Sequence, residues 1–200
     1  MRVDIISSQI DYQYKSLFTM RRLRLQHERF DGQMSGEMER VVFERVDAVG
    51  VLLYDAAADA VVLIKQFRLP AYLHDGSGWL IEIVAGVLDK GRDAMTVAHS
   101  ELVEEIGYHV AELTRLGTCY LSPGGSTEQI HLYLGDLQQA QRVNAGGGLA
   151  SEHEDIQFIR LPLADALAMI ECGEICDAKT IIALQQLVLR RPLTATCRKI

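Results

Sequence analysis

The stretch from residue 85 to residue 108 constrains the fold most, because it predicts a helix with three glutamates on one face. Glu104 and Glu105 follow Glu101 at three and four residues, so on an α-helix their carboxylates converge. Their mutual repulsion indicates a bound cation, and hard oxygen ligands of this kind suit Mg²⁺ or Mn²⁺. The alternative is a solvated acidic surface, since glutamate is a good helix former.

The other face of this helix is apolar. Met95, Leu102 and Ile106 recur at helical spacing and form a stripe that can pack on a sheet. A strand-like run, WLIEIVAG, comes before the helix, and Gly107 is the expected left-handed residue that ends it. The sequence therefore predicts a strand, a glycine turn and a half-buried helix in succession.

Extended segments with alternating polarity fill residues 1–45 and predict a small N-terminal antiparallel β lobe. The dipeptide Asp31-Gly32 between two of these segments is a strong hairpin signal. Such a sheet has open edges and little core of its own. We therefore expect the main domain or a second subunit to cover it.

Residues 46–200 form the predicted main domain, in which strand-like runs and helical segments are interleaved. Two helices end the chain, the first introduced by Pro162 and the second capped by Asp177. A polar segment with Gly146, Gly147 and Gly148 is expected to be a flexible loop. The order of elements is not a strict βαβ alternation, so it favours an α/β sandwich with a mixed sheet.

The composition limits the classes of partner. A chain of 200 residues with 48% hydrophobic residues can bury a sizeable core. Its net charge of -7 argues against binding to nucleic acid or to a membrane surface. We find no signal peptide and no long apolar run, which predicts a cytoplasmic protein. Cys172 and Cys176 have no second pair at metal spacing and do not indicate zinc.

The glutamate stretch resembles the Nudix box, whose pattern is G, five residues, E, seven residues, then R-E-U-x-E-E-x-G-U, with U a bulky apolar residue. The following residues occupy matching positions: Gly86, Glu101, Leu102, Glu104, Glu105 and Gly107. Arg92 stands at the first Glu position, Ser100 at the Arg position, and Tyr108 is only roughly a U residue. The family's salt bridge between the first two of these positions is therefore absent. Because both partners are replaced, we expect a looser box and an intact metal site. Arg92 could alternatively pair with Asp89 or Glu101.

The resemblance implies roles for the acidic residues in cleaving a pyrophosphate, which requires cations on the phosphate oxygens and an oriented water. It makes Glu101, Glu105 and the Ala85 carbonyl ligands of Mg²⁺, with Mn²⁺ as a substitute. Glu104 would bind a further metal or orient water.

A general base is implied on the segment that follows the three glycines. Glu152 matches the family's catalytic glutamate best, and Glu154 is the reserve. His153 suits a base by its ordinary pKa, but the family uses a carboxylate there. The alternative is an ordinary exposed acidic loop.

The resemblance also implies substrate contacts. Arg40 and Arg68 match arginines that bind phosphate in the family, and the guanidinium group suits this role. Either arginine could instead pair with Glu39 or Glu44 at the surface. Further expected contacts come from the Ser-Pro-Gly-Gly segment and the glutamate after it: Ser122, Gly124, Gly125 and Glu128.

Similarity to the family covers nearly the whole chain and points to its branch of pyrophosphatases that act on GDP-mannose and ADP-ribose. This implies a Nudix-type α/β/α sandwich that hydrolyses a nucleoside diphosphate sugar to a nucleoside monophosphate and a sugar phosphate. It also implies a homodimer whose N-terminal lobes, residues 1–45, cross between subunits and help form the base pocket. The alternative function is a catalytically weak sensor that binds a nucleotide ligand and acts through partners.

Overall fold

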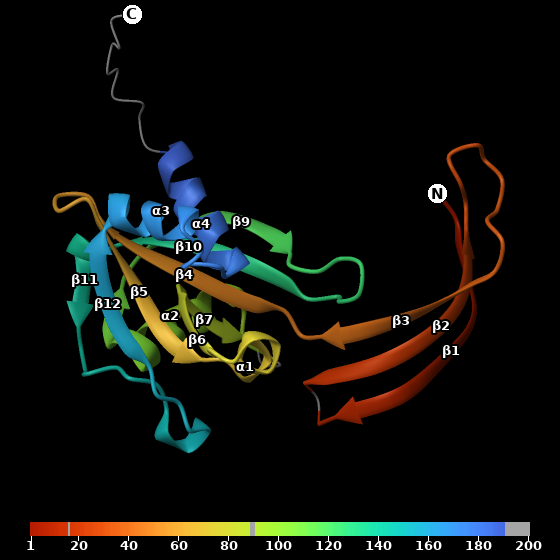
Figure 1. Ribbon diagram of the computed structural model, residues 1–200, viewed down its shortest axis with the longest axis horizontal. Coiled ribbons are helices and arrows are strands. Elements are labelled where there is room, and N and C mark those ends of the chain that lie inside the picture. The colour runs from red at the N-terminus through yellow and green to blue at the C-terminus, as the bar shows by residue number, and fades with distance from the viewer. Residues whose placement is uncertain (16, 89–90, 191–200) are drawn as a thin grey trace, which may run out of the picture. The chain divides into compact units, whose positions relative to one another are not determined.

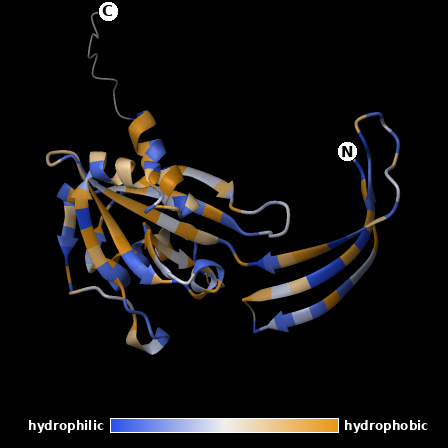
Figure 2. Cartoon of the chain, in the orientation of Figure 1, coloured by the Kyte–Doolittle hydropathy of each residue, from blue (hydrophilic) through white to orange (hydrophobic). Residues whose placement is uncertain are grey.

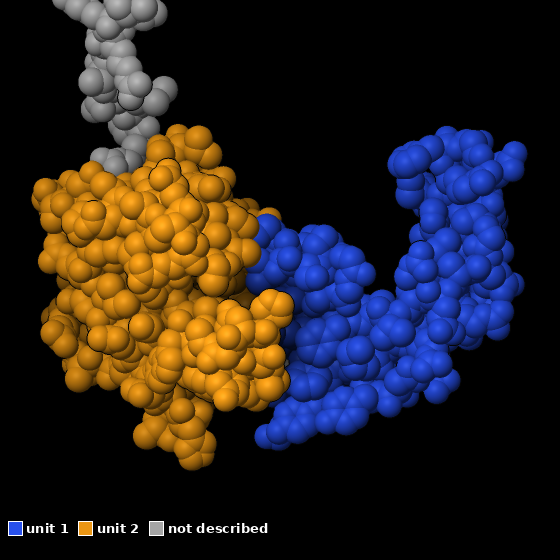
Figure 3. All heavy atoms as spheres, viewed as in Figure 1, with its two compact units in different colours: residues 1–47, 119–129 blue, residues 48–118, 130–200 orange. Residues whose placement is uncertain are grey.

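The computed structural model describes residues 1–15, 17–88 and 91–190. The chain forms two compact units, coloured separately in Figure 3. Unit 1 contains Met1–Asp47 and Cys119–Gln129, and unit 2 contains Ala48–Thr118 and the chain from Ile130 onward. Each unit is described by itself below.

Unit 1 is built on a three-stranded antiparallel sheet of order β1-β2-β3. Polar and apolar residues alternate along these strands, as Figure 2 shows. This confirms the expected N-terminal antiparallel sheet. The segment 119–129, which the sequence analysis assigned to the main domain, joins this unit through hydrogen bonds of Phe43 with Gly125 and Thr127. The strands are β1 (Val3–Tyr14), β2 (Phe18–His27) and β3 (Met38–Arg45).

Unit 2 is built on a seven-stranded mixed sheet. Its main path runs β12-β5-β4-β10-β9, with β6 paired to β5 and β7 paired to β4. The pairing of β4 with β10 is parallel. The other pairings are antiparallel: β4 pairs with β5 and β7, and β5 pairs with β6 and β12. The strands are β4 (Ala48–Asp55), β5 (Ala60–Phe67), β6 (Trp79–Glu82), β7 (Val84–Val87), β9 (Leu113–Tyr120), β10 (Gln129–Asp136) and β12 (Gln157–Pro162).

Helices cover both faces of this sheet and make an α/β/α sandwich. Figure 1 shows α2 (Ala94–Ile106) on one face and α3 (Leu163–Glu171) and α4 (Ala178–Arg190) on the other. The core under α2 joins Leu102 and Ile106 to buried residues of β4 and β5, as the apolar stripe predicts. This confirms the predicted fold class. No helix among the described residues has the length and apolar character needed to cross a membrane.

The run WLIEIVAG, expected as one strand, forms two strands that meet at Ile83. Residues 79–82 pair with β5, and residues 84–87 pair with β4. The Ile83 N–H, which lies at the change of partner, donates to the Thr180 hydroxyl oxygen at 2.8 Å. A side chain 97 positions away therefore satisfies a buried donor that would otherwise be unpaired.

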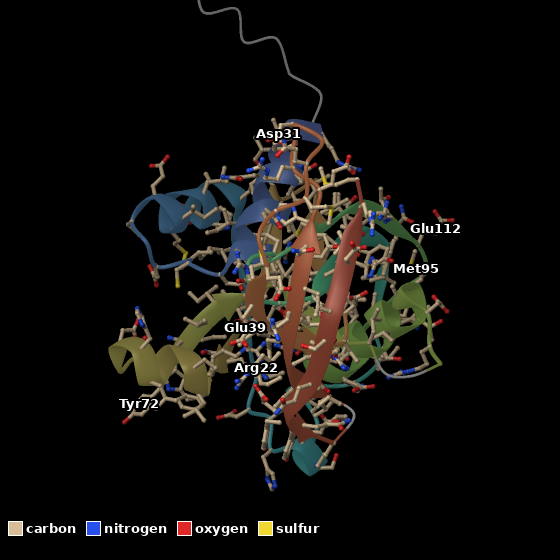
Figure 4. All side chains as sticks on the ribbon, turned by 90° about the vertical axis from the view of Figure 1, so that its right-hand side faces the viewer. Arg22, Asp31, Glu39, Tyr72, Met95 and Glu112 are labelled. Atoms are coloured by element: carbon tan, nitrogen blue, oxygen red, sulfur yellow. The ribbon has the colours of Figure 1, made fainter. Side chains whose placement is uncertain are left out.

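Several short elements were not expected from the sequence. The helix α1 (Leu69–Asp75) begins with a proline in its first turn and ends at Gly76, which has a φ of 86°. Tyr72 projects from its outer side (Figure 4) and is half exposed. The strands β8 (Tyr108–Val110) and β11 (Ala140–Arg142) pair antiparallel as a separate two-stranded sheet. Two 3-10 turns, Leu137–Gln139 and Ala150–Glu152, complete the described elements.

Candidate active site

The helix α2 sets the direction of the glutamate cluster. Asp93 caps its first turn, because its carboxylate accepts hydrogen bonds from the N–H groups of Met95 and Thr96 at 3.0 and 3.1 Å. Gly107 ends the helix with a φ of 76°, as predicted. Since Leu102 is fully buried, the helix cannot rotate without exposing its apolar face. The side chains of the glutamates are therefore held along one side of the buried stripe.

Glu105 is the most buried carboxylate of this cluster. The residue is only 2% exposed, and its carboxylate accepts a hydrogen bond from the Ala85 N–H at 3.2 Å. Burial, and then repulsion from Glu101, raise its pKa to about 9, although the Ala85 bond and the charge of Arg68 act against this. The cluster thus holds a carboxyl group that loses its proton readily only when positive charge is nearby.

Glu101 lies where the cluster meets β7. Burial raises its pKa to about 7, followed by repulsion from Glu104, Glu154 and Glu152. A Cβ on Gly86 would stand 1.9 Å from the Glu101 carboxylate oxygen. The glycine at the start of the box therefore leaves space for this carboxylate. Any side chain at position 86 would displace it.

The loop from residue 143 to residue 156 docks on the C-terminal end of α2. The N–H groups of Gly147 and Gly148 donate to the carbonyl oxygens of Glu105 and Glu104 at 2.8 and 3.1 Å. These carbonyls have no partner within the helix, so the loop supplies one. A Cβ on Gly146 would lie 2.6 Å from the Ile106 carbonyl carbon, and the φ at position 146 is +68°. Gly146 therefore allows the loop to approach the helix backbone closely. The flexibility expected of the three glycines stays a prediction.

The docked loop brings both predicted catalytic carboxylates to the cluster. The charges of Glu152 and Glu154 each add to the effects of burial and Glu104 on the Glu101 pKa, and Glu154 also acts on Glu105. Glu154 is partly buried, and its Oε2 accepts a hydrogen bond from the Leu149 N–H at 2.9 Å. Glu152 is exposed at the end of a 3-10 turn. The structure thus brings together carboxylates from two segments some fifty positions apart in the chain.

Arg68 is held by a buried carboxylate. Its guanidinium Nη2 donates to the Glu82 Oε2 at 2.6 Å, and its Nε lies 3.2 Å from both oxygens. The Lys179 ammonium lies 3.1 Å from the same Glu82 and 3.0 Å from Asp177. Although burial raises the Glu82 pKa, the hydrogen bonds from Arg68 and the charge of Lys179 bring it below its ordinary value. Asp177 also accepts from the Thr180 N–H at 3.0 Å, which confirms the predicted cap of α4.

Comparison with known proteins decides the family. The model of the NUDIX domain family matches residues 44–183. The chain belongs to the Nudix family. Its relatives include GDP-mannose pyrophosphatases of Escherichia coli O1:K1 and Shigella flexneri, each 41% identical over 171 residues, which cover 85% of this chain and 87% of the relative. A solved ADP compounds hydrolase is 19% identical with a TM-score of 0.70, covers 94% of both chains, and shows the same fold.

The two unusual positions of the Nudix box contact each other. The Arg92 Nη1 donates to the Ser100 Oγ at 3.0 Å, and the Ser100 Oγ donates to the Thr96 carbonyl at 3.2 Å. The segment before α2 is therefore still attached to the helix, by a neutral acceptor in place of an ion pair. The expectation of a looser box with an intact metal site stays a prediction. The suggested pairing of Arg92 with Asp89 lies outside the described residues.

The remaining predicted substrate residues of this Nudix protein lie in unit 1. Gly124 and Gly125 line a pocket of about 310 Å³ together with Val42, Tyr120, Pro123, Ser126 and Thr127. The Ser122 carbonyl accepts from the N–H groups of Gly125 and Ser126, which closes the turn. Glu128 forms an ion pair with Arg45 at 3.4 Å.

Among the described residues, no ion pair joins Arg40 or Arg68 to the carboxylate of Glu39 or Glu44. Arg40 donates to the Glu39 carbonyl oxygen at 2.8 Å, and Glu44 pairs with Arg21 at 2.7 Å.

Sequence reasoning missed the ion-pair network of Arg68. Its signal was present, because Glu82 is a charged residue inside the apolar run WLIEIV and Lys179 stands in the first turn of an apolar helix. A charge in such a position requires a buried partner. Only the folded chain shows that Glu82 and Lys179 pair with each other, and that Glu82 also binds Arg68 while Lys179 also binds Asp177.

No three His, Cys, Asp or Glu side chains in the described part of the chain form a complete metal site. Mg²⁺ usually keeps several water ligands and needs only one or two carboxylates with substrate phosphates. The acidic cluster fits this incomplete type of site, because Glu105 is buried, Glu101 is partly buried, and the raised pKa of each shows that its ionised form needs nearby positive charge.

Proposed function

We propose that this Nudix protein hydrolyses the pyrophosphate bond of a nucleoside diphosphate sugar. GDP-mannose is the first candidate substrate, and ADP-ribose is the second. The products are a nucleoside monophosphate and a sugar phosphate. The observation that carries the proposal is the convergence of the carboxylates of α2 with those of the docked loop, supported by relatives that bear the name GDP-mannose pyrophosphatase.

Mg²⁺ is the proposed cofactor, with Mn²⁺ as a substitute. Glu101, Glu105 and the Ala85 carbonyl would hold it, and Glu104 would bind a further ion or orient water. The bound cation supplies neutralisation of the phosphate oxygens and a lower pKa for the attacking water. The chain contributes carboxylates that are already in place, because α2 is capped at both ends and packed on its apolar face.

Glu152 is the proposed general base, with Glu154 as the reserve. Glu152 is exposed and close enough to affect Glu101 electrostatically, so it can accept a proton from water beside the cluster. Glu154 holds the loop by accepting from Leu149. Glu152→Gln is expected to lower kcat by about a hundredfold or more with little change in KM. If Glu154→Gln does so instead, the base is Glu154.

Arginines complete the proposed substrate site. Arg68, oriented by Glu82, would bind a phosphate oxygen from unit 2. Arg40, Ser122, Gly124, Gly125 and Glu128 would contact the nucleotide from unit 1. We further propose that the protein is a cytoplasmic homodimer in which residues 1–45 help form the base pocket.

The experiment that tests this function measures GMP release from GDP-mannose and AMP release from ADP-ribose, with Mg²⁺ and with EDTA. Product is expected only with the metal, and Glu101→Gln should abolish most of it. Asp165→Asn, an exposed change on α3, serves as the matched control. A wild-type protein that binds GDP-mannose but releases no metal-dependent product from any nucleoside diphosphate sugar would indicate the sensor instead.

A further inference from the structure

A positive charge stands beside the acidic cluster of unit 2. In the Nudix box pattern, the positions of Arg92 and Ser100 carry a glutamate and an arginine, whose charges cancel. In this chain they carry an arginine and a serine, which leaves one net positive charge. The contacts described above attach Arg92 to the helix α2 but give its charge no role.

The backbone next to Arg92 is fixed by the cap of α2. The Asp93 carboxylate accepts hydrogen bonds from the Thr96 N–H at 3.1 Å and from the Thr96 hydroxyl group at 2.7 Å. These bonds set where α2 begins, and therefore where the Arg92 side chain starts. Because that side chain is exposed, its direction depends on what its guanidinium group contacts.

The guanidinium group of Arg92 is held at the level of the glutamates. Its Nη1 donates to the Ser100 Oγ at 3.0 Å, and the Ser100 Oγ donates to the Thr96 carbonyl oxygen at 3.2 Å. The serine is therefore oriented by the helix and presents a lone pair to the arginine. Ser100 directly precedes Glu101 and lies one helical turn before Glu104. The contact thus carries the positive charge along α2, away from its N-terminus and toward the cluster.

Two observations connect this charge with the cluster. Ser100, which holds the guanidinium group, and Glu104 line the same pocket of about 500 Å³. Burial and the repulsion of the neighbouring glutamates raise the Glu101 pKa to about 7, and the charge of Arg92 acts in the opposite direction. The first observation concerns position and the second concerns charge. Both indicate that Arg92 lies within the electrostatic reach of the proposed metal ligands.

A fixed positive charge at this place has opposite effects on the two partners of the proposed reaction. It repels a divalent cation that approaches the carboxylates, and it attracts the phosphate groups of a nucleoside diphosphate sugar. For a single and a double charge about 8 Å apart near a protein surface, Coulomb's law with screening by salt gives about a fivefold change in affinity. A purely structural link would instead change the binding of both partners in the same direction.

We propose that Arg92, held by Ser100, weakens the binding of a divalent cation to the acidic cluster before substrate arrives and strengthens the binding of the substrate anion. The cation then binds more readily together with the substrate phosphates, which add oxygen ligands and offset the charge of Arg92. Arg92 is a positioning residue that acts through the cation and the substrate charge, and it is no metal ligand. Its effect on the substrate rests on the proposed function, whereas its effect on the cation does not require turnover.

Direct binding of Mn²⁺ to the full-length protein tests the effect on the cation. Free Mn²⁺ is measured by electron paramagnetic resonance at low salt and at pH 8, above the Glu101 pKa of about 7. Arg92→Gln is expected to lower the Kd about fivefold, and about 0.5 M KCl should remove most of this difference. Arg92→Lys, which keeps the charge, should bind Mn²⁺ like the wild type. Arg115→Gln is the matched control with an unchanged Kd, because it removes another exposed guanidinium group that donates to a hydroxyl oxygen, that of Thr118.

A double variant separates the charge of Arg92 from its attachment to the helix. Arg92→Glu with Ser100→Arg introduces an oppositely charged pair, so the two positions can still bind each other while the net positive charge is lost. This variant should bind Mn²⁺ about fivefold more tightly than the wild type, as Arg92→Gln does. Circular dichroism checks that each variant is folded. An unchanged or weaker affinity for Mn²⁺ in both folded variants would overturn the proposal.

Kinetics with GDP-mannose tests the effect on the substrate. Arg92→Gln should raise KM about fivefold and lower the Mg²⁺ concentration that gives half of the maximal rate. If KM and this Mg²⁺ concentration rise together, Arg92 acts by bracing the box and the proposal is rejected. A wild type without turnover rejects the proposed function instead, while the Mn²⁺ titration still decides whether Arg92 opposes cation binding.

Discussion

At the scale of single residues, Glu105 combines deep burial with a neighbouring like charge. Burial and Glu101 raise its pKa to about 9 in the folded, metal-free protein, against an ordinary value of 4.5. Between pH 4.5 and about pH 9, Glu105 therefore holds a proton in the folded state that it has released in the unfolded state. Stability from this group is present below pH 4.5 and is lost as the pH rises toward 9. Glu101 acts in the same direction, with a pKa of about 7.

This predicts that the melting temperature of the metal-free protein falls between pH 5 and pH 8 more steeply in the wild type than in Glu105→Gln. Mg²⁺ should raise the melting temperature more at pH 8 than at pH 5, because it binds the ionised form. Differential scanning calorimetry with EDTA or Mg²⁺ measures both effects. Equal slopes for the wild type and Glu105→Gln would contradict the assigned pKa shift.

Glu82 is the residue on which Arg68 and Lys179 both depend. Glu82→Gln leaves two cations without their shared partner, and removal of one member of a buried ion pair typically costs about 3–5 kcal/mol. We expect a loss of about 3 kcal/mol in urea unfolding, since Arg68 keeps some contact with water. Asp165→Asn, which also replaces a carboxylate by an amide but at an exposed position of α3, is the control. A variant of Glu82 with unchanged stability would show that the network is dispensable.

At the scale of elements, the docked loop joins the proposed base, Glu152, to the acidic cluster of α2 through backbone contacts. Gly146→Ala would place a Cβ 2.6 Å from the backbone of Ile106 at a φ that disfavours alanine. The loop would have to shift, and misplacement of a catalytic group by about 1 Å can cost about a hundredfold in rate. We expect kcat for GDP-mannose to fall by about that factor while Mg²⁺ affinity changes little.

Gly117→Ala is the matched control for this prediction, since its Cβ would meet open space in β9. Steady-state kinetics and Mg²⁺ titration of both variants provide the measurement. If Gly146→Ala keeps the wild-type kcat, close docking of the loop does not position the base.

Elements that depend on local signals were predicted from the sequence, and elements that depend on distant partners were not. The helix α2 follows from its apolar stripe and from Gly107, and the cap of α4 follows from Asp177. The division of β6 from β7 depends on the Thr180 hydroxyl, which no local pattern reveals. The carboxylates were recognised through spacing and family resemblance, but the burial of Glu105 and the docking of the loop on the carbonyl oxygens of Glu104 and Glu105 required the fold.

At the scale of the whole molecule, unit 1 exposes apolar side chains along a strand at the edge of its sheet. Val3, Ile5, Ile10 and Tyr12 of β1 are each about half exposed. Long apolar edge strands are usually covered, because they pair or pack readily with another chain. The proposed homodimer would cover this surface with a second copy of unit 1.

This predicts a dimer in solution, and a monomer when Ile5 and Ile10 are both replaced by Lys, because buried lysines would oppose association. Light scattering coupled to gel filtration measures the mass, and Leu189→Lys, at a 76% exposed position on α4, is the control. If the base pocket is shared between subunits, kcat/KM for GDP-mannose falls as the dimer dissociates, while the melting temperature of unit 2 is retained. A wild type that is monomeric at micromolar concentration would refute the proposed assembly, and a fully active monomeric variant would confine the site to one subunit.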